Sequence, residues 1–133
     1  MTRPSHYYNS LTWGPLKPTS ILGYRQLMFK CTERYKHETG DNSRSHCAVA
    51  LIEHYVNGLY PLTPDLPDRL RDWGRPYQIT FYLPRPLLRK ASTLFKYQTG
   101  LDNRTAMLLA LQEAYMCGAF NFAKVERNNE DSD

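Results

Sequence analysis

Residues 77–83, with the sequence YQITFYL, alternate between apolar and polar side chains. One face of this extended segment carries the apolar side chains of Ile79, Phe81 and Leu83. The opposite face carries Gln78, Thr80 and Tyr82. Such alternation in a β-branched and aromatic segment is typical of a strand that buries one face. Pro84 and Pro86 follow, and they suit the first turn of a helix, where a missing N–H has no intrahelical partner.

After the strand the hydrophobic period becomes helical. In residues 85–98 the apolar positions are Leu87, Leu88, Ala91, Leu94 and Phe95, which share one face of a helix. Thr99 and Gly100 are expected to end this helix, because glycine readily takes the left-handed closing conformation. A second helix is predicted from Arg104 to about Cys117, capped by Asp102 or Asn103. Its apolar face would carry Met107, Leu108, Leu111 and Tyr115.

The two halves of the chain are related by a gapless repeat with an offset of 60 residues. Residues 36–60 align with residues 96–120, and nine of the 25 positions are identical. The identical pairs are Lys36/Lys96, Thr39/Thr99, Gly40/Gly100, Arg44/Arg104, Ala50/Ala110, Leu51/Leu111, Glu53/Glu113, Tyr55/Tyr115 and Gly58/Gly118. A unit that cannot bury its own apolar face is expected to bury it against its copy. We therefore expect one pseudo-symmetric body, for which 133 residues provide a moderate single core.

The first half is predicted to have the same order of elements. One helix runs from about Tyr24 to Glu38, and a second, capped by Ser43 or Ser45, ends at Gly58. The strand before them is either 17–23, which the offset indicates, or 9–13, which would turn Leu11 and Trp13 inward. The segment 17–23 contains Pro18, which cannot donate to a ladder. We favour 17–23 because the repeat places it there.

The remaining segments are predicted to lie outside these two units. They are an N-terminal arm (1–16), a proline-rich linker (59–76) and an acidic flexible tail (119–133). The prolines of the linker favour a stiff, extended chain. Within the tail, the residues after Phe122 have the composition of a disordered segment.

The charge pattern adds a candidate class of partner. The chain has a net charge of +4, but the last eight residues alone hold four acids and one arginine. The rest has 16 basic and nine acidic residues, a net charge of +7. Residues 1–32 and 73–101 contain no acid, and these stretches occupy similar places in both halves. This recurrence favours a polyanionic partner over a merely solvated surface.

Other candidate chemistry in the chain is weak. The four histidines include His46 and His54, which are eight residues apart and thus too far to hold one metal ion without other ligands. Cys31 and Cys47 are interpreted as core residues in a reducing compartment. No motif of a hydrolase, a metalloprotease or a nucleotide-binding loop is present, so we expect neither an enzyme nor a cofactor. Glu53 and Glu113 are expected to form salt bridges rather than to act as acid–base catalysts.

No stretch approaches the length of a membrane span, and the N-terminus lacks the apolar run of a signal peptide. We therefore expect a cytoplasmic protein without a membrane partner.

The order strand, helix, helix resembles that of the ribbon-helix-helix family of Arc/MetJ-like DNA-binding regulators. The matching segments are QITFYLP (78–84), RPLLRKASTLFKYQTG (85–100) and NRTAMLLALQEAY (103–115). The resemblance covers residues 77–118 and, more loosely, residues 17–58, so that the chain resembles the tandem, single-chain members. It implies a mainly α fold with a two-stranded antiparallel ribbon, a tandem ribbon-helix-helix pseudo-dimer. The family's ribbon enters the DNA major groove, which admits two strands.

The resemblance implies that outward side chains of the ribbon read base edges. On the second strand these would be Gln78, Thr80 and Tyr82, which can bond bases or, for threonine, contact a thymine methyl. On the first strand the equivalents are Pro18, Ser20 and Leu22, of which we retain only Ser20. Because that set is poor, a symmetrical recognition site is not expected.

The family also holds phosphates at the N-terminus of each second helix, where free N–H groups and the helix dipole favour an anion. The corresponding residues are Ser43, Arg44, Ser45, Asn103, Arg104 and Thr105. Arg75 and Arg85, beside the second strand, are further phosphate candidates. The alternative for the identical pair Arg44/Arg104 is an exposed arginine that bonds its own turn.

The expected function is sequence-dependent binding of double-stranded DNA, in transcriptional regulation or as an accessory protein of a mobile element. The alternative is a ribbon-helix-helix scaffold that has become a protein–protein interaction module without DNA binding. The many tyrosines and the degenerate first strand favour this alternative. The two units form the pseudo-dimer within one chain, and further self-association stays open.

Overall fold

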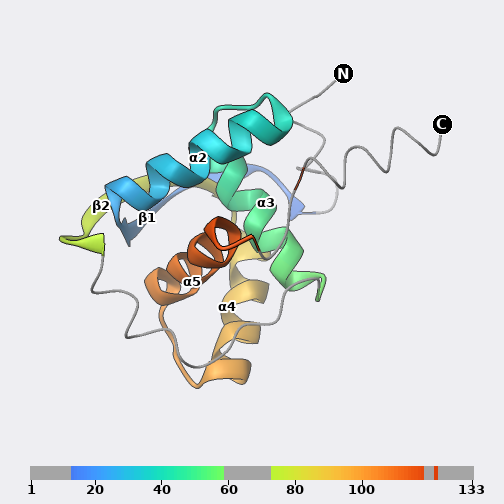
Figure 1. Cartoon of the computed structure of the whole chain (residues 1–133). Helices are drawn as coiled ribbons and strands as arrows, with labels where there is room; N and C mark the ends of the chain where they lie inside the picture. The colour runs from blue at the N-terminus through green and yellow to red at the C-terminus, as the bar shows by residue number, and fades with distance from the viewer. Residues whose placement is uncertain (1–12, 59–72, 119–121, 123–133) are drawn as a thin grey trace.

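A computed structural model of the chain describes residues 13–58, 73–118 and Phe122. These residues form two strands and four helices, in the order strand, helix, helix and then the same again. The elements are β1 (Leu16–Gly23), α2 (Arg25–Thr39), α3 (Arg44–Val56), β2 (Tyr77–Pro84), α4 (Arg85–Thr99) and α5 (Arg104–Met116) (Figure 1). The fold is therefore mainly helical with a two-stranded antiparallel sheet, as predicted.

The ends of the helices follow the local sequence. Of the alternative caps, Ser43 and Asn103 are used: their side-chain oxygens accept from the backbone N–H groups of His46 and Ala106, each at 3.1 Å. Gly40 and Gly100 end the first helix of each half at φ 85° and 81°, a conformation that favours glycine.

The strands β1 and β2 form a ribbon whose register is centred on the pair Ser20–Thr80. These two residues are also equivalent under the 60-residue offset. The pairs on either side of it follow the same symmetry. Thr19 pairs with Phe81, and Ile21 pairs with Ile79. Thr19 is equivalent to Ile79, and Ile21 is equivalent to Phe81. The first strand is thus the one that the repeat indicated. The alternative, 9–13, lies outside the described residues except for Trp13.

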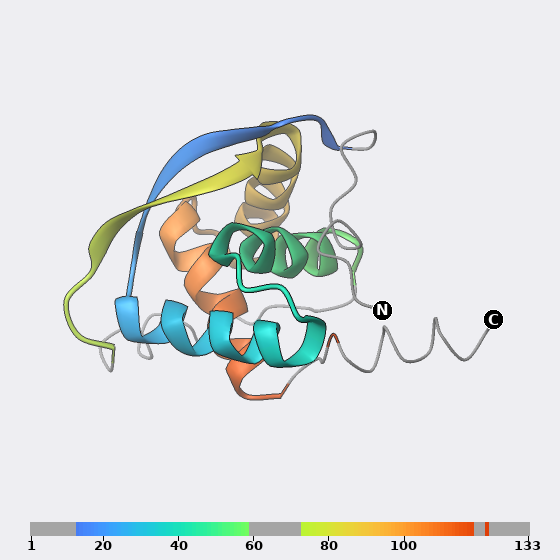
Figure 2. The same ribbon diagram turned by 90° about the horizontal axis from the view of Figure 1, so that it is seen from above.

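The helices lie on one side of the ribbon, which arches over them in Figure 2. The ribbon turns Thr19, Ile21, Ile79, Phe81 and Leu83 toward the helices, and all are buried there. The opposite side of the ribbon faces outward. The alternation of residues 77–83 therefore has the predicted cause: one face packs against the core and the other is exposed.

The two halves exchange hydrogen bonds at equivalent positions. Tyr115 of α5 donates to the Glu38 carboxylate at the end of α2, and Tyr55 of α3 donates to Gln98 at the end of α4, at 2.8 Å. Burial and the bond to Glu38 raise the pKa of the Tyr115 hydroxyl far above its ordinary value, and burial raises that of Tyr55 to about 12. Both hydroxyls therefore stay protonated at neutral pH and can donate, and each bond holds the second helix of one half against the first helix of the other.

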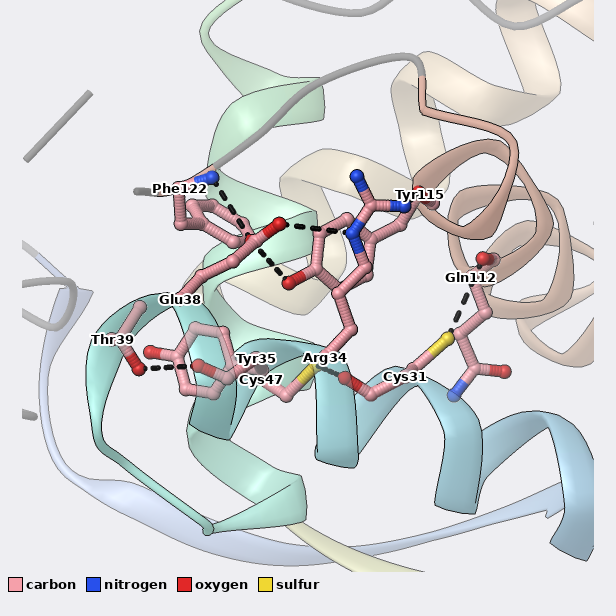
Figure 3. A network of polar contacts seen from close by, with 9 residues as sticks. All are labelled: Cys31, Arg34, Tyr35, Glu38, Thr39, Cys47, Gln112, Tyr115 and Phe122. Carbon is pink, nitrogen blue, oxygen red and sulfur yellow. Dashed lines mark hydrogen bonds and ion pairs between the residues drawn. The ribbon is translucent and has the colours of Figure 1, made fainter. Parts of the chain in front are cut away.

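Glu38 is the centre of a polar network inside this interface (Figure 3). Its carboxylate pairs with Arg34 at 2.9 Å and accepts the backbone N–H of Phe122 at 3.1 Å. Arg34 also donates to the Tyr115 carbonyl at 2.6 Å. The ring of Phe122 is fully buried and meets Tyr35 edge to face, with 5.4 Å between ring centres.

Phe122, which lies within the predicted tail (119–133), is buried against the helices. An aromatic ring buries a large apolar area, which holds this point of the chain against α2 and α5. The other residues of that tail lie outside the described residues, as do most of the predicted arm (1–16) and linker (59–76).

A tryptophan precedes each strand and extends the repeat beyond its predicted limits. Trp13 donates its indole N–H to Glu53 at 2.8 Å, and Trp73 donates to Glu113 at 2.7 Å. The ammonium groups of Lys90 and Lys30, each from the other half, lie over the Trp13 and Trp73 rings at 5.7 and 5.6 Å. Among the residues that the structure describes, Glu53 and Glu113 form no salt bridge, contrary to expectation. Each carboxylate accepts from a neutral indole instead.

Candidate nucleic-acid interface

The exposed side of the ribbon is uncharged along its centre. We call it the outer face and define it by Pro18, Ser20 and Leu22 of β1 with Gln78, Thr80 and Tyr82 of β2, all of which are exposed. Across the strands Pro18 pairs with Tyr82, Ser20 with Thr80, and Leu22 with Gln78. Hydroxyl and amide groups are thus interleaved with apolar ones on a surface two strands wide.

The base-reading candidates lie together on this face. Gln78, Thr80, Tyr82 and Ser20 all point away from the helices. Sequence reasoning discounted Leu22, but its side chain is 48% exposed beside Gln78, comparable to Tyr82 at 52%. The signal was present in the period-2 pattern of β1, in which Leu22 follows Ser20 by two residues.

The N-terminus of α3 packs against the outer edge of β2. The Arg44 guanidinium, which is exposed, donates to the Thr80 carbonyl at 3.3 Å. The Ser45 hydroxyl is buried and accepts the N–H of Tyr82 at 2.9 Å. Arg44 therefore bonds the neighbouring strand rather than its own turn. With the Ser43 hydroxyl engaged as the cap, an anion here would meet the Arg44 side chain and first-turn backbone N–H groups.

The N-terminus of α5 has the same place relative to β1. Asn103 uses its side chain as the cap, Thr105 is half-buried and Arg104 is exposed. Arg104 makes no hydrogen bond or ion pair with any residue that the structure describes, so its guanidinium is available to a ligand.

Equivalent hollows lie where each strand edge meets the starts of two helices. The hollow beside β1 measures about 570 Å³, and its lining includes Ser20, Arg85, Arg89, Asp102 and Arg104. Its counterpart beside β2 measures about 480 Å³, and its lining includes Arg25, Phe29, Arg44, Gln78 and Thr80. Both are basic, since Asp102 is the one acid that lines either of them. The predicted phosphate residue Arg85 lies in the first hollow.

Arg75 is exposed and lies two residues before β2 in the chain. Asp41, the acid nearest the start of α3 in sequence, is buried and pairs with His46 at 2.7 Å. Among the described residues the ribbon is therefore flanked by arginines with little compensating acid, a charge distribution that favours phosphates.

The thiols of Cys31 and Cys47 lie in the core. Burial raises the pKa of the Cys31 thiol to about 12 and that of Cys47 well above its ordinary value, so both stay protonated core residues. Within residues 13–58, 73–118 and Phe122, no group of three or more His, Cys, Asp or Glu residues could hold a metal ion. No described helix has both the length and the apolar composition to span a bilayer.

Comparisons of the chain with protein-family models, with curated proteins and with solved structures found no match.

Proposed function

We propose that the chain binds double-stranded DNA in a sequence-dependent manner, with the ribbon of β1 and β2 in the major groove. The observation that carries this proposal is the outer face: uncharged, partly hydrogen-bonding side chains on two antiparallel strands, with an arginine beside each outer edge. The major groove is about 12 Å wide and admits a two-stranded ribbon.

The chemistry of the surface supports separate roles for the outer face, which would contact bases, and for the arginines at the helix N-termini, which would contact phosphates. Amide and hydroxyl groups such as Gln78 and Thr80 can bond base edges, which present both donors and acceptors in the groove. Arg44 and Arg104 lie at helix N-termini, where the dipole and free N–H groups also attract a phosphate. Phosphate contacts fix the position of a protein on DNA, while base contacts select the sequence.

The arrangement of the halves supports a tandem ribbon-helix-helix body, a pseudo-dimer within one chain. The register centred on Ser20–Thr80, the exchanged bonds of Tyr55 and Tyr115, and the equivalent hollows all fit an approximate twofold relation. In the cell, such a protein fits transcriptional control or accessory binding on a mobile element.

A protein-interaction module is the second candidate, and exposed apolar groups favour it. Leu22, Tyr82 and Pro18 lie on the outer face, while Phe29 on the neighbouring helix is 64% exposed. Apolar groups on a surface often mark a protein contact. The arginines on both edges of the ribbon favour DNA instead.

Fluorescence anisotropy with labelled genomic fragments at two salt concentrations tests the proposal. We expect binding that weakens steeply with salt, because phosphate contacts release counterions. Arg104→Ala should weaken binding to all sequences and lower the salt slope by about one. Lys36→Ala removes an equal charge near the far end of α2 and should leave both quantities unchanged.

Failure to bind any duplex at about 50 mM salt would contradict DNA binding. A capture experiment from lysate with and without nuclease then examines the second candidate. A partner that survives nuclease treatment and is lost in a Leu22→Ala variant would support the interaction module.

A further inference from the structure

The two ends of the outer face differ in chemistry although the repeat relates them. Under the 60-residue offset Leu22 is equivalent to Tyr82, and Gln78 is equivalent to Pro18. The register joins Leu22 to Gln78 at one end and Pro18 to Tyr82 at the other. One end therefore combines an amide with an aliphatic side chain, and the other combines a proline ring with a phenol.

The surroundings of each end strengthen the difference. Beside Leu22 and Gln78 lie exposed aromatic rings: Tyr77, with the Arg25 guanidinium 4.0 Å from its ring centre, and Phe29. The equivalent positions at the other end hold Lys17 and Arg89, both exposed. None of the strand positions 16–23 is identical to its equivalent in 76–83, whereas Arg25/Arg85, Lys30/Lys90 and Arg44/Arg104 remain identical nearby.

We propose that the Leu22–Gln78 end selects an A·T base pair and that the Pro18–Tyr82 end does not, so the DNA site is non-palindromic. This inference rests on the proposed DNA binding. A glutamine amide offers one donor and one acceptor, which match N7 and N6–H₂ of adenine in the major groove. Leucine has no polar group to offer but suits the thymine methyl, which projects into the same groove.

The cross-strand geometry brings these two contacts together. Side chains directly opposite on an antiparallel ribbon have Cβ atoms about 4.5–5.5 Å apart. Leu22 and Gln78 can thus reach the thymine and the adenine of one pair or of two neighbouring pairs. Pro18 offers no donor or acceptor from its side chain at the equivalent place, and Tyr82 offers only a single hydroxyl.

Selection from random duplexes followed by a thymine-to-uracil replacement tests this inference. Uracil removes the methyl group alone, so wild-type protein should lose about fourfold in affinity when the selected A·T pair carries it. Leu22→Ala should bind the thymine and uracil duplexes equally. Gln78→Ala should lose on the order of tenfold or more in discrimination between A·T and G·C at that pair.

Pro18→Ala is the matched control for Gln78→Ala, because the two positions are equivalent, and it should keep the A·T preference. Both Leu22 and Gln78 are exposed, so thermal melting should show that their variants remain folded. A palindromic selected site, or a uracil effect that persists in Leu22→Ala, would overturn the inference and leave DNA binding intact. Absence of binding to every duplex would overturn both.

Discussion

Neighbouring side chains of β2 have opposite surroundings, because a strand turns alternate residues to opposite faces. Phe81 is 1% exposed among the helices, whereas Tyr82 is 52% exposed. We expect Phe81→Ala to cost about 3–5 kcal/mol, a large part of a total stability of roughly 5–15 kcal/mol. Thr80→Ala, on the outer face, should change stability by less than about 0.5 kcal/mol.

Thermal melting of the Phe81→Ala and Thr80→Ala variants beside the wild type measures this contrast. In DNA titrations the Thr80→Ala variant, which remains stable, should lose base discrimination. A Thr80→Ala variant that melts far below wild type, beside a normal Phe81→Ala variant, would mean that the strand faces the other way.

Glu53 is the residue whose ionisation should be visible in the stability of the protein. Burial raises its pKa from the ordinary value of 4.5 to about 7, although the bond from the Trp13 indole acts in the opposite direction. Between these two pH values the folded protein holds the proton more tightly than the unfolded chain does. The contribution of Glu53 to stability is therefore full below about pH 4.5 and declines as the pH rises to about 7.

Chemical denaturation of wild type and Glu53→Gln across this pH range gives the test. The amide can still accept from Trp13 but does not ionise, so the variant should lose this decline in stability. Glu33→Gln, on the exposed face of α2, should retain it. An unchanged pH dependence in Glu53→Gln would show that the carboxyl group ionises alike in the folded and unfolded chain.

At the scale of the elements, α3 and α5 are each held by a hydrogen bond from a tyrosine hydroxyl, and the two acceptors differ in charge. Tyr115 donates to Glu38, which also pairs with Arg34, whereas Tyr55 donates to the neutral amide of Gln98. Hydrogen bonds to charged groups contribute about 1.5–3 kcal/mol and neutral ones about 0.5–1.5 kcal/mol. We therefore expect Tyr115→Phe to destabilise the protein more than Tyr55→Phe does.

Urea unfolding of the two phenylalanine variants compares these bonds at equivalent places of one molecule. Tyr97→Phe is the control, since this side chain is 87% exposed and should leave stability unchanged. A larger loss of unfolding free energy in Tyr55→Phe than in Tyr115→Phe would contradict the expected ranking of the two hydrogen bonds.

The local pattern of the chain predicted elements more fully than it predicted contacts between them. Period and capping indicated β2 and all four helices, because these depend on residues a few positions apart. They narrowed each cap of the second helices to two residues, of which Ser43 and Asn103 are used. The bond from Arg44 to the Thr80 carbonyl spans 36 residues and depends on how α3 meets the ribbon. The bonds of Trp13 and Trp73 were also missed, although a Trp-Gly pair at the same offset gave a signal.

For the molecule as a whole, contacts between the halves predict a single cooperative transition. The chain has two tryptophans, and each is in contact with a lysine of the other half. In Trp13→Phe the fluorescence of Trp73 should therefore change at the same denaturant concentration as the far-UV circular dichroism. Trp73→Phe should behave in the same way, with Trp13 as the probe.

Coincident transitions in both single-tryptophan variants are the expected result. A fluorescence midpoint that separates from the dichroism midpoint in either variant would mean that one half unfolds before the other. The equivalent surroundings of the two indoles make each variant the control for the other.

The network around Glu38 has a consequence for the order in which the chain is made. The partners of its carboxylate, Tyr115 and Phe122, follow it by 77 and 84 residues. A ribosome that adds about 5–20 residues per second needs roughly 4–17 s to reach them. During that time α2 and α3 exist as a nascent segment whose apolar faces have no second half to cover them. We expect this growing chain, rather than the finished protein, to be the form that most needs a chaperone.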